Sequence, residues 1–131
     1  MKMIFICSPY RGKVEKNTEI AKRIAHIAAV CDYIPVVPHL LFPQFMEDHR
    51  PEDRIKSLRM GAEQLRKCDE MWLLVGKLSR GMQYMLDIAI ENKIPIRLID
   101  SKVDRISPTT LSIDDRVDEE FLEAVKGANL V

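Results

Sequence analysis

Four short runs of apolar residues constrain the fold of this chain more than any other feature of its sequence. They cover about residues 2–7, 34–38, 71–75 and 94–99. Nearly continuous apolar runs of this length are typical of strands in a parallel sheet that is buried on both faces. Between the runs, apolar residues recur at helical spacing. This alternation predicts right-handed βαβ crossovers and a sheet with helices on both faces.

The spacing of apolar residues predicts helices over about residues 14–31, 51–68, 81–92 and 119–126. Pro51 suits a first helical turn, Ser79 is placed to cap the third helix, and Asp118 is expected to cap the last helix. The residues expected to face the core are Ile55, Leu58, Ala62 and Leu65 in the second helix, and Met82, Met85, Leu86 and Ala89 in the third.

These elements predict one α/β domain over residues 1–131, with a flavodoxin-like, three-layer arrangement and a mainly parallel sheet in the strand order 2-1-3-4, plus a possible edge strand. Residues 2–100 form the expected core, and residues 101–131 an arm with a final helix. We expect residues 39–50 to be a long connection that covers a site or meets a partner, because it is too apolar for a solvated loop. Residues 101–117 are expected to be an irregular polar segment.

Composition limits the partners and the location of the chain. Its 20 Lys and Arg balance its 20 Asp and Glu, so no basic field favours a nucleic-acid partner. The apolar start is too short for a signal peptide or a membrane span, which favours a cytoplasmic location. Cys7, Cys31 and Cys68 lack metal-ligand spacing and are odd in number, so we interpret them as small buried residues in a reducing compartment.

Two loops are expected to meet at one edge of the sheet, because the carboxyl ends of parallel strands share an edge. The first is Ser8-Pro9-Tyr10-Arg11-Gly12 and the second is Ser79-Arg80-Gly81-Met82. Amides before a helix bind anions, an arginine can bind phosphate through two donors, and a tyrosine can stack on a base. His39 either faces the ligand or has a structural role. No Walker or GxGxxG motif occurs, and we expect no metal and no cofactor.

Four segments resemble the nucleoside 2-deoxyribosyltransferase superfamily over about residues 2–100: residues 3–12, the Cys68-Asp69 pair, the second loop and the Asn92-Lys93-Ile94-Pro95 segment. The chain is most similar to small phage and bacterial members, and less to deoxyribonucleoside 5′-monophosphate N-glycosidases. The resemblance implies a flavodoxin-like homo-oligomer that cleaves or exchanges an N-glycosidic bond.

The resemblance also places the family's nucleophile on this chain. In that family a glutamate four residues after the glycine of the second loop attacks the anomeric carbon, and counting from Gly81 reaches Met85. The family's aspartate falls near Gly61. Asp87 is the nearest substitute for the nucleophile, yet two residues along a helix turn it by roughly 200°. The loops that would hold a ligand therefore match, whereas the two carboxylates do not.

Three interpretations follow from these observations. The first is a protein that binds a nucleotide or nucleoside through Ser8, Tyr10, Arg11, Gly12, His39, Ser79, Gly81, Met82 and Met85. The second is an active N-glycosidase or deoxyribosyltransferase that uses Asp87, Glu91 or a carboxylate of a neighbouring subunit. The third is an interaction subunit that buries residues 40–46 and the segment after Asp100 against another chain.

Overall fold

The computed structural model describes residues 1–131. Its strands are β1 (Met3–Cys7), β2 (Ile34–Val36), β3 (Glu70–Leu74) and β4 (Ile96–Ile99). Its α-helices are α1 (Val14–Val30), α2 (Pro38–Leu41), α3 (Pro51–Arg66), α4 (Arg80–Glu91) and α5 (Glu119–Ala124). Two 3-10 helices, η1 (Phe42–Gln44) and η2 (Pro108–Ile113), complete the chain.

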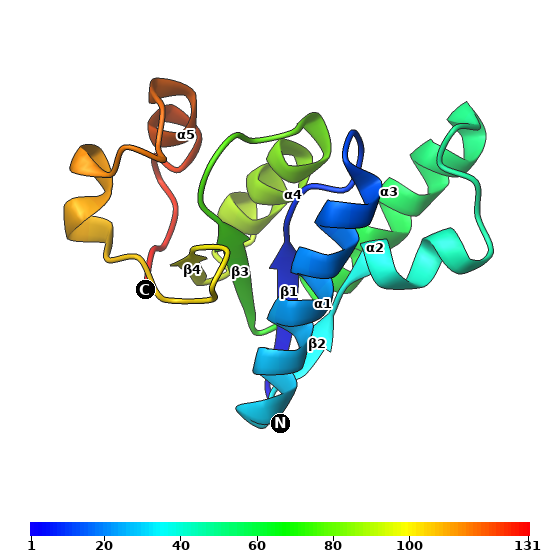
Figure 1. Cartoon of the computed structure of the whole chain (residues 1–131), viewed down its shortest axis with the longest axis horizontal. Coiled ribbons are helices and arrows are strands. Elements are labelled where there is room, and N and C mark those ends of the chain that lie inside the picture. Colours follow the sequence, from blue (N-terminus) through cyan, green and yellow to red (C-terminus); the bar gives the residue numbers. More distant parts are fainter.

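The four strands form one parallel sheet in the order β2-β1-β3-β4 (Figure 1). Phe5 at the centre of β1 lies opposite Val36 on one side and Met71 on the other. The predicted α/β class, parallel sheet and strand order are confirmed. The common direction of the strands brings the loops that follow β1, β2 and β3 to one edge of the sheet.

The chain forms an isolated bridge where the sequence allowed for a fifth strand. Ile96 pairs in parallel with Leu130, and the carbonyl of Asn129 accepts a 2.8 Å hydrogen bond from the Ile96 amide. The Val131 amide in turn donates to the Ile96 carbonyl at 2.9 Å. The end of the chain thus covers part of the outer edge of β4 without forming a strand.

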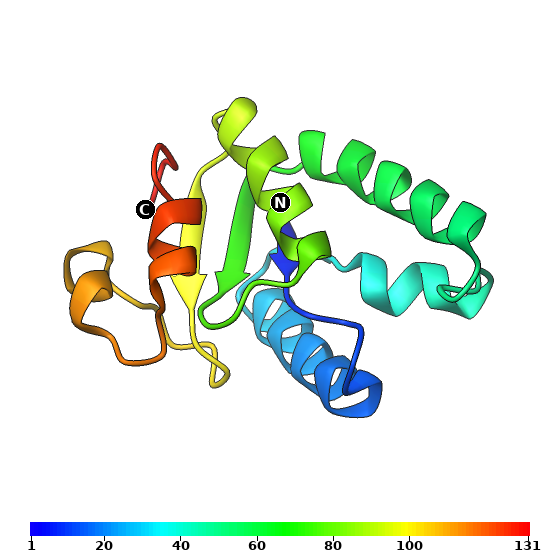
Figure 2. The same ribbon diagram turned by 90° about the horizontal axis from the view of Figure 1, so that it is seen from above.

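Helices cover both faces of the sheet (Figure 2). Helix α1 lies on one face, where Ile24 and Ala28 pack against Ile4, Ile6 and Trp72. Helices α3, α4 and α5 lie on the other face and bury the larger core cluster, which includes Phe5, Leu65, Leu86, Leu98 and Phe121. No helix combines the length and the apolar character that crossing a bilayer requires.

Two connections are more regular than expected. The connection between β2 and α3, expected as a loop over residues 39–50, contains α2 and η1, which have a proline in their first turns at Pro38 and Pro43. Residues 101–117 contain η2, which has Pro108 in its first turn and is capped by the Ser107 side chain. Proline fits a first turn because its missing N–H has no partner there.

Two side chains expected to be buried are exposed. Ile55 is 59% exposed, because the first turns of α3 extend beyond the sheet, and its buried residues begin at Gly61 (Figure 2). Cys31 follows the last turn of α1 and is exposed, whereas Cys7 and Cys68 are buried as predicted. In both cases the helical period is right, but the sheet is too narrow to cover every apolar residue.

Candidate functional site

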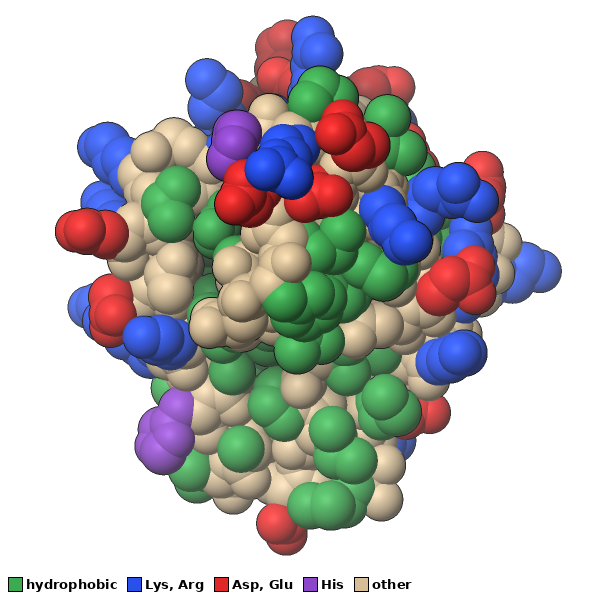
Figure 3. Space-filling model, turned by 90° about the vertical axis from the view of Figure 1, so that its right-hand side faces the viewer, with side chains coloured by type: hydrophobic (Ala, Val, Ile, Leu, Met, Phe, Trp, Pro, Cys, Tyr) green, Lys and Arg blue, Asp and Glu red, His purple; other side chains and the backbone are tan.

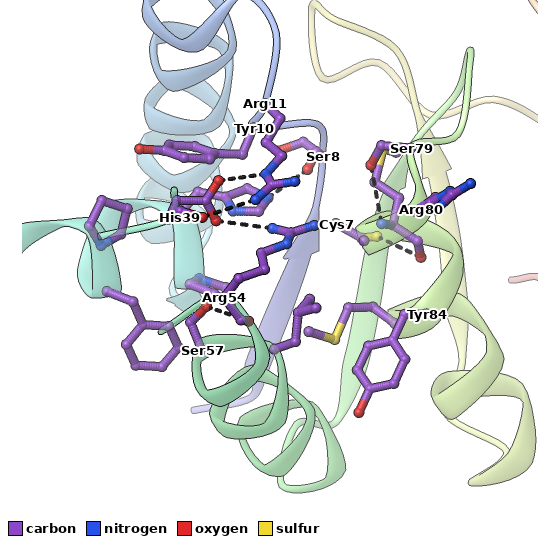
Figure 4. Close-up of a pocket in the computed structure, with 18 of the residues that line it drawn as sticks. Cys7, Ser8, Tyr10, Arg11, His39, Arg54, Ser57, Ser79, Arg80 and Tyr84 are labelled. Atoms are coloured by element: carbon purple, nitrogen blue, oxygen red, sulfur yellow. Dashed lines mark hydrogen bonds and ion pairs between the residues drawn. The ribbon is translucent and has the colours of Figure 1, made fainter. Parts of the chain in front are cut away.

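A cavity of about 520 Å³ opens at the carboxyl end of β1 (Figure 4). Its walls come from the loop after β1, from α2 and η1, from the start of α3, and from the start of α4. Eight of the predicted binding residues line it, namely Ser8, Tyr10, Arg11, His39, Ser79, Gly81, Met82 and Met85. The topology therefore brings the two predicted loops to one cavity.

Gly12 and Asp87 do not line this cavity. Gly12 adopts a φ of 92°, so its role is in the turn that leads into α1. Asp87 is exposed on α4, because two residues of helix rotate it away from buried Met85. The structure thus gives no place at the cavity to the carboxylate that the sequence offered as a catalytic substitute.

The loop after β1 is held in place by side chains from two neighbouring elements. The Asn17 amide donates to the carbonyl oxygens of Tyr10 and Arg11, at 3.1 and 3.2 Å. His39 Nε2 lies 2.7 Å from the Ser8 carbonyl oxygen, and because a carbonyl only accepts, this nitrogen carries the proton. The His39 ring stacks on Tyr10, with centroids 5.1 Å apart and planes at 22°. His39 therefore positions the loop, which is the structural role considered for it.

Burial lowers the pKa of His39 below its ordinary value, although the bond to the Ser8 carbonyl acts in the opposite direction. The neutral imidazole is accordingly the form that the fold stabilises. Ser8 itself is 1% exposed, and its hydroxyl has no hydrogen-bond partner in the structure. The cavity thus contains a buried hydroxyl that is free to bond.

Ser79 caps α4, as predicted, by accepting a 3.2 Å hydrogen bond from the Met82 amide. The amides of Arg80 and Gly81 in the same first turn donate to no acceptor of the chain. A Cβ added at Gly81 would lie 3.2 Å from Nη2 of Arg54. Glycine at this position therefore lets the Arg54 guanidinium reach the start of α4.

Asp48 and Arg54 are site residues that the sequence interpretation missed. The Asp48 carboxylate binds Arg11 Nε at 2.6 Å through one oxygen and Arg54 Nη1 at 3.2 Å through the other (Figure 4). Arg11 also donates to the Asp48 carbonyl at 2.9 Å. Burial raises the pKa of Asp48, but the two arginines outweigh this effect and hold it below the ordinary value. The predicted anion-binding arginine, Arg11, is thus paired with a carboxylate of the protein itself.

The opposite side of the cavity is apolar. Met85 is 6% exposed, and a Cβ added at Gly61 would lie 2.8 Å from its Cε atom. The resemblance places the family's nucleophilic glutamate at Met85 of α4 and its aspartate near Gly61 of α3. Here a thioether packs over a glycine, so this pair of positions carries no charge.

Cys7 is the one thiol that lines the cavity. Its Sγ atom lies 3.7 Å from the Met82 carbonyl, and burial raises its pKa to about 12. Only thiolates are effective nucleophiles, so Cys7 is unreactive near neutral pH. The chain also forms no group of three or more His, Cys, Asp or Glu side chains that could hold a metal ion.

A solved structure of a 2-deoxyribosyltransferase from the psychrotolerant bacterium Bacillus psychrosaccharolyticus has the same fold, with a TM-score of 0.64. The alignment covers 92% of this chain and 88% of the enzyme, at 16% sequence identity. At that identity the likeness concerns the fold alone. No curated protein matches the sequence.

The family described as "Domain of unknown function (DUF7768)" matches residues 2–99. The matched region contains the whole sheet and both loops of the cavity, and it ends with β4. Since this region is most of the chain, the protein belongs to the DUF7768 family.

Proposed function

We propose that this protein binds a nucleoside or nucleotide in the cavity and does not cleave its glycosidic bond. The observation that carries the proposal is the cavity itself, which combines the two predicted loops with uncharged apolar surface at Met82 and Met85. Its volume of about 520 Å³ is in the range of small-molecule sites. The related fold of a 2-deoxyribosyltransferase supports a nucleoside ligand.

The lining offers a distinct partner to each part of such a ligand. Tyr10 stacks on His39 through one face of its ring, which leaves the other face for a base. The Ser8 hydroxyl and the first amides of α4 are hydrogen-bonding groups without a partner. Met82 and Met85 supply apolar surface.

The carboxylates near the cavity are poorly suited to attack a sugar. Those in its lining are Asp48 and Asp53. Asp48 is bound by two arginines, and Asp53 accepts a 2.9 Å hydrogen bond from the Glu47 amide. The Met85 thioether cannot act as the anionic nucleophile of a retaining mechanism. These contacts favour ligand binding over catalysis by this chain alone.

The test is to titrate the purified protein with the four 2′-deoxynucleosides and their 5′-monophosphates by calorimetry, and to follow free base by chromatography. We expect saturable binding without release of base. Tyr10→Leu should weaken binding about tenfold, since an aromatic contact contributes roughly 0.5–1.5 kcal/mol beyond its buried area. Tyr33→Leu is the matched control, because Tyr33 packs against Trp72 on the α1 face of the sheet.

Two results would overturn the proposal. If no nucleoside or nucleotide binds, the cavity has another ligand or the chain acts as an interaction subunit. If the wild-type protein releases base, it is an enzyme, and the loss of activity in Asp48→Ala, Asp87→Ala or Glu91→Ala would identify the carboxylate. Activity that all three variants retain would indicate a carboxylate from a neighbouring subunit.

A further experiment places a nucleophile in the site. Met85→Glu supplies a carboxylate at the position that the resemblance assigns to it, and Met85→Gln has the same size without the charge. Base release by the glutamate variant alone is the expected result if the ligand lies against α4. If the glutamate variant binds ligand yet remains as inactive as the glutamine variant, the sugar does not lie at residue 85.

A further inference from the structure

Three charged side chains of the cavity form a group that the proposed nucleoside site does not by itself require. They are Arg11 from the loop after β1 and Arg54 from α3, both labelled in Figure 4, and Asp48 from the turn before α3, which binds both. Arg80 and Asp53 also line the cavity, so its three arginines exceed its two aspartates by one positive charge. The cavity is thus cationic although the whole chain is neutral.

Asp48 binds these arginines as an external anion would. Each of its carboxylate oxygens contacts a different guanidinium, at 2.6 and 3.2 Å. Paired arginines are a common binding arrangement for phosphate, which offers more acceptor oxygens and more charge than a carboxylate does. The Asp48 side chain is 26% exposed, so a ligand can approach it from solvent.

Other hydrogen-bond donors without a partner line the same cavity. Nη2 of Arg54 lies beside Gly81 and donates to no acceptor of the chain. The Arg80 and Gly81 amides, also without an acceptor, begin the 12-residue helix α4, whose dipole favours an anion at this end. The buried Ser8 hydroxyl lines the same cavity without a partner. These donors exceed what the single carboxylate of Asp48 can satisfy.

We propose that Arg11 and Arg54 form a subsite for a phosphate group, and that Asp48 occupies this subsite in the present structure and competes with the ligand for the arginines. The inference rests on the proposed nucleoside site and specifies a phosphorylated ligand. Asp48 then makes the site selective for phosphorylated ligands. A nucleoside leaves the ion pairs of Asp48 with Arg11 and Arg54 intact, whereas the phosphate of a nucleotide replaces Asp48 at one or both arginines.

Competition predicts that neutralising Asp48 strengthens anion binding. Titration with inorganic pyrophosphate, which carries no base, tests the subsite alone. Asp48→Asn should bind pyrophosphate about tenfold more tightly than the wild type, and added salt should reduce the gain because exposed charges are screened. Asp114→Asn is the matched control, because it frees Arg116 from a 2.6 Å ion pair on the carboxy-terminal arm. This control should leave pyrophosphate affinity unchanged.

The second arm compares each 2′-deoxynucleoside with its 5′-monophosphate. The wild type should favour the monophosphate, Asp48→Asn should widen the preference about tenfold, and Arg54→Gln should abolish it. Arg116→Gln is the control for loss of an arginine. Arg54→Lys, which keeps the charge, should retain part of the preference if the fold is intact, as judged by circular dichroism.

The outcomes separate this inference from the proposed function. Equal pyrophosphate affinity in the wild type and Asp48→Asn would overturn the competition. Nucleoside binding without preference for the monophosphate would overturn the phosphate subsite and leave the proposed function standing. Pyrophosphate binding that Asp48→Asn strengthens, without binding of any nucleoside or nucleotide, would reject the proposed function but retain an anion site.

Discussion

The two sides of the cavity are held together by different forces. The polar wall, which comprises Ser8–Arg11, His39, Asp48 and Arg54, is joined by ion pairs and hydrogen bonds. The apolar wall, which comprises Met82 and Met85, is held mainly by the packing of these side chains in the larger core cluster, where Met85 also lies over Gly61. Charged contacts respond to pH, salt and competing ions, whereas packing responds to volume. On the proposed function, the polar wall is the part that discriminates among ligands, whereas the apolar wall supports the fold.

The molecular surface shows the same contrast. Figure 3 shows apolar side chains gathered near the centre of one face, with Lys, Arg, Asp and Glu side chains around them. The exposed apolar residues of the α2–α3 region include Leu41, Phe45 and Ile55. Positively and negatively charged side chains thus lie close to apolar surface. The same type of substitution can therefore be compared at a charged position and at an apolar one.

The largest expected effect is on the apolar wall. Met85→Ala should lower the free energy of unfolding by about 2 kcal/mol, at the lower end for buried methionines because one side of the residue faces the cavity. Met46→Ala is the matched substitution on the half-buried segment before α3, and it should cost less than half as much. Urea denaturation measures both. Equal losses would mean that Met85 is packed no more tightly than Met46.

The next effect concerns the start of α4, where the two walls meet. Ser79→Ala removes the 3.2 Å bond to the Met82 amide and should cost about 1 kcal/mol of stability. Ser107→Ala removes a longer bond of 3.4 Å at the start of η2, and its cost should be smaller. Urea denaturation of the two variants measures their free energies of unfolding, and an unchanged m-value shows that the substitutions alter stability alone. A larger loss for Ser107→Ala would contradict this order.

The polar wall should make stability depend on pH. Because burial lowers the pKa of His39 in the folded protein, the unfolded chain binds a proton first as the pH falls. The contribution of His39 to the free energy of unfolding is therefore complete when the pH is above 6.5, the ordinary pKa of histidine. It decreases as the pH falls below that value. His39→Gln should remove this part of a stability profile between pH 7.5 and 5. His26→Gln, on the exposed side of α1, is the control and should retain it.

The smallest expected effect tests the packing of the apolar wall directly. Gly61→Ala gains about 1 kcal/mol of helix propensity but pushes against the flexible end of Met85, so the net change in stability should be near zero. In the Met85→Ala background the same substitution should stabilise by about 1 kcal/mol. A double-mutant cycle gives the coupling. Additive effects would show that the two residues do not touch.

Local signals in the sequence were sufficient for most of the fold. The apolar runs located all four strands, and Ser79 and Asp118 were identified as helix caps from residue type and position. The helical period correctly placed Met82 and Met85 on the buried face of α4. It failed at Ile55, because a period shows which residues share a face and not how far the sheet extends beneath them.

The cavity was only partly predictable. Its two loops follow strands that neighbour each other, so the parallel topology was enough to bring Ser8 and Ser79 to one edge. No local pattern in the sequence connects Asp48 or Arg54 to Arg11. The only available signal was an unusually apolar connection that already pointed to a cover over the site.

The sequence by itself determined the α/β class, the strand order, the two loops and the presence of a methionine rather than a carboxylate at position 85. Only the tertiary structure decided that Asp48 binds Arg11 across 37 residues and that Met85 packs over Gly61. The physical reason is range. Strand and helix periods express contacts among near neighbours along the chain, whereas charge pairing and packing at the cavity depend on the distances that the folded sheet and helices impose.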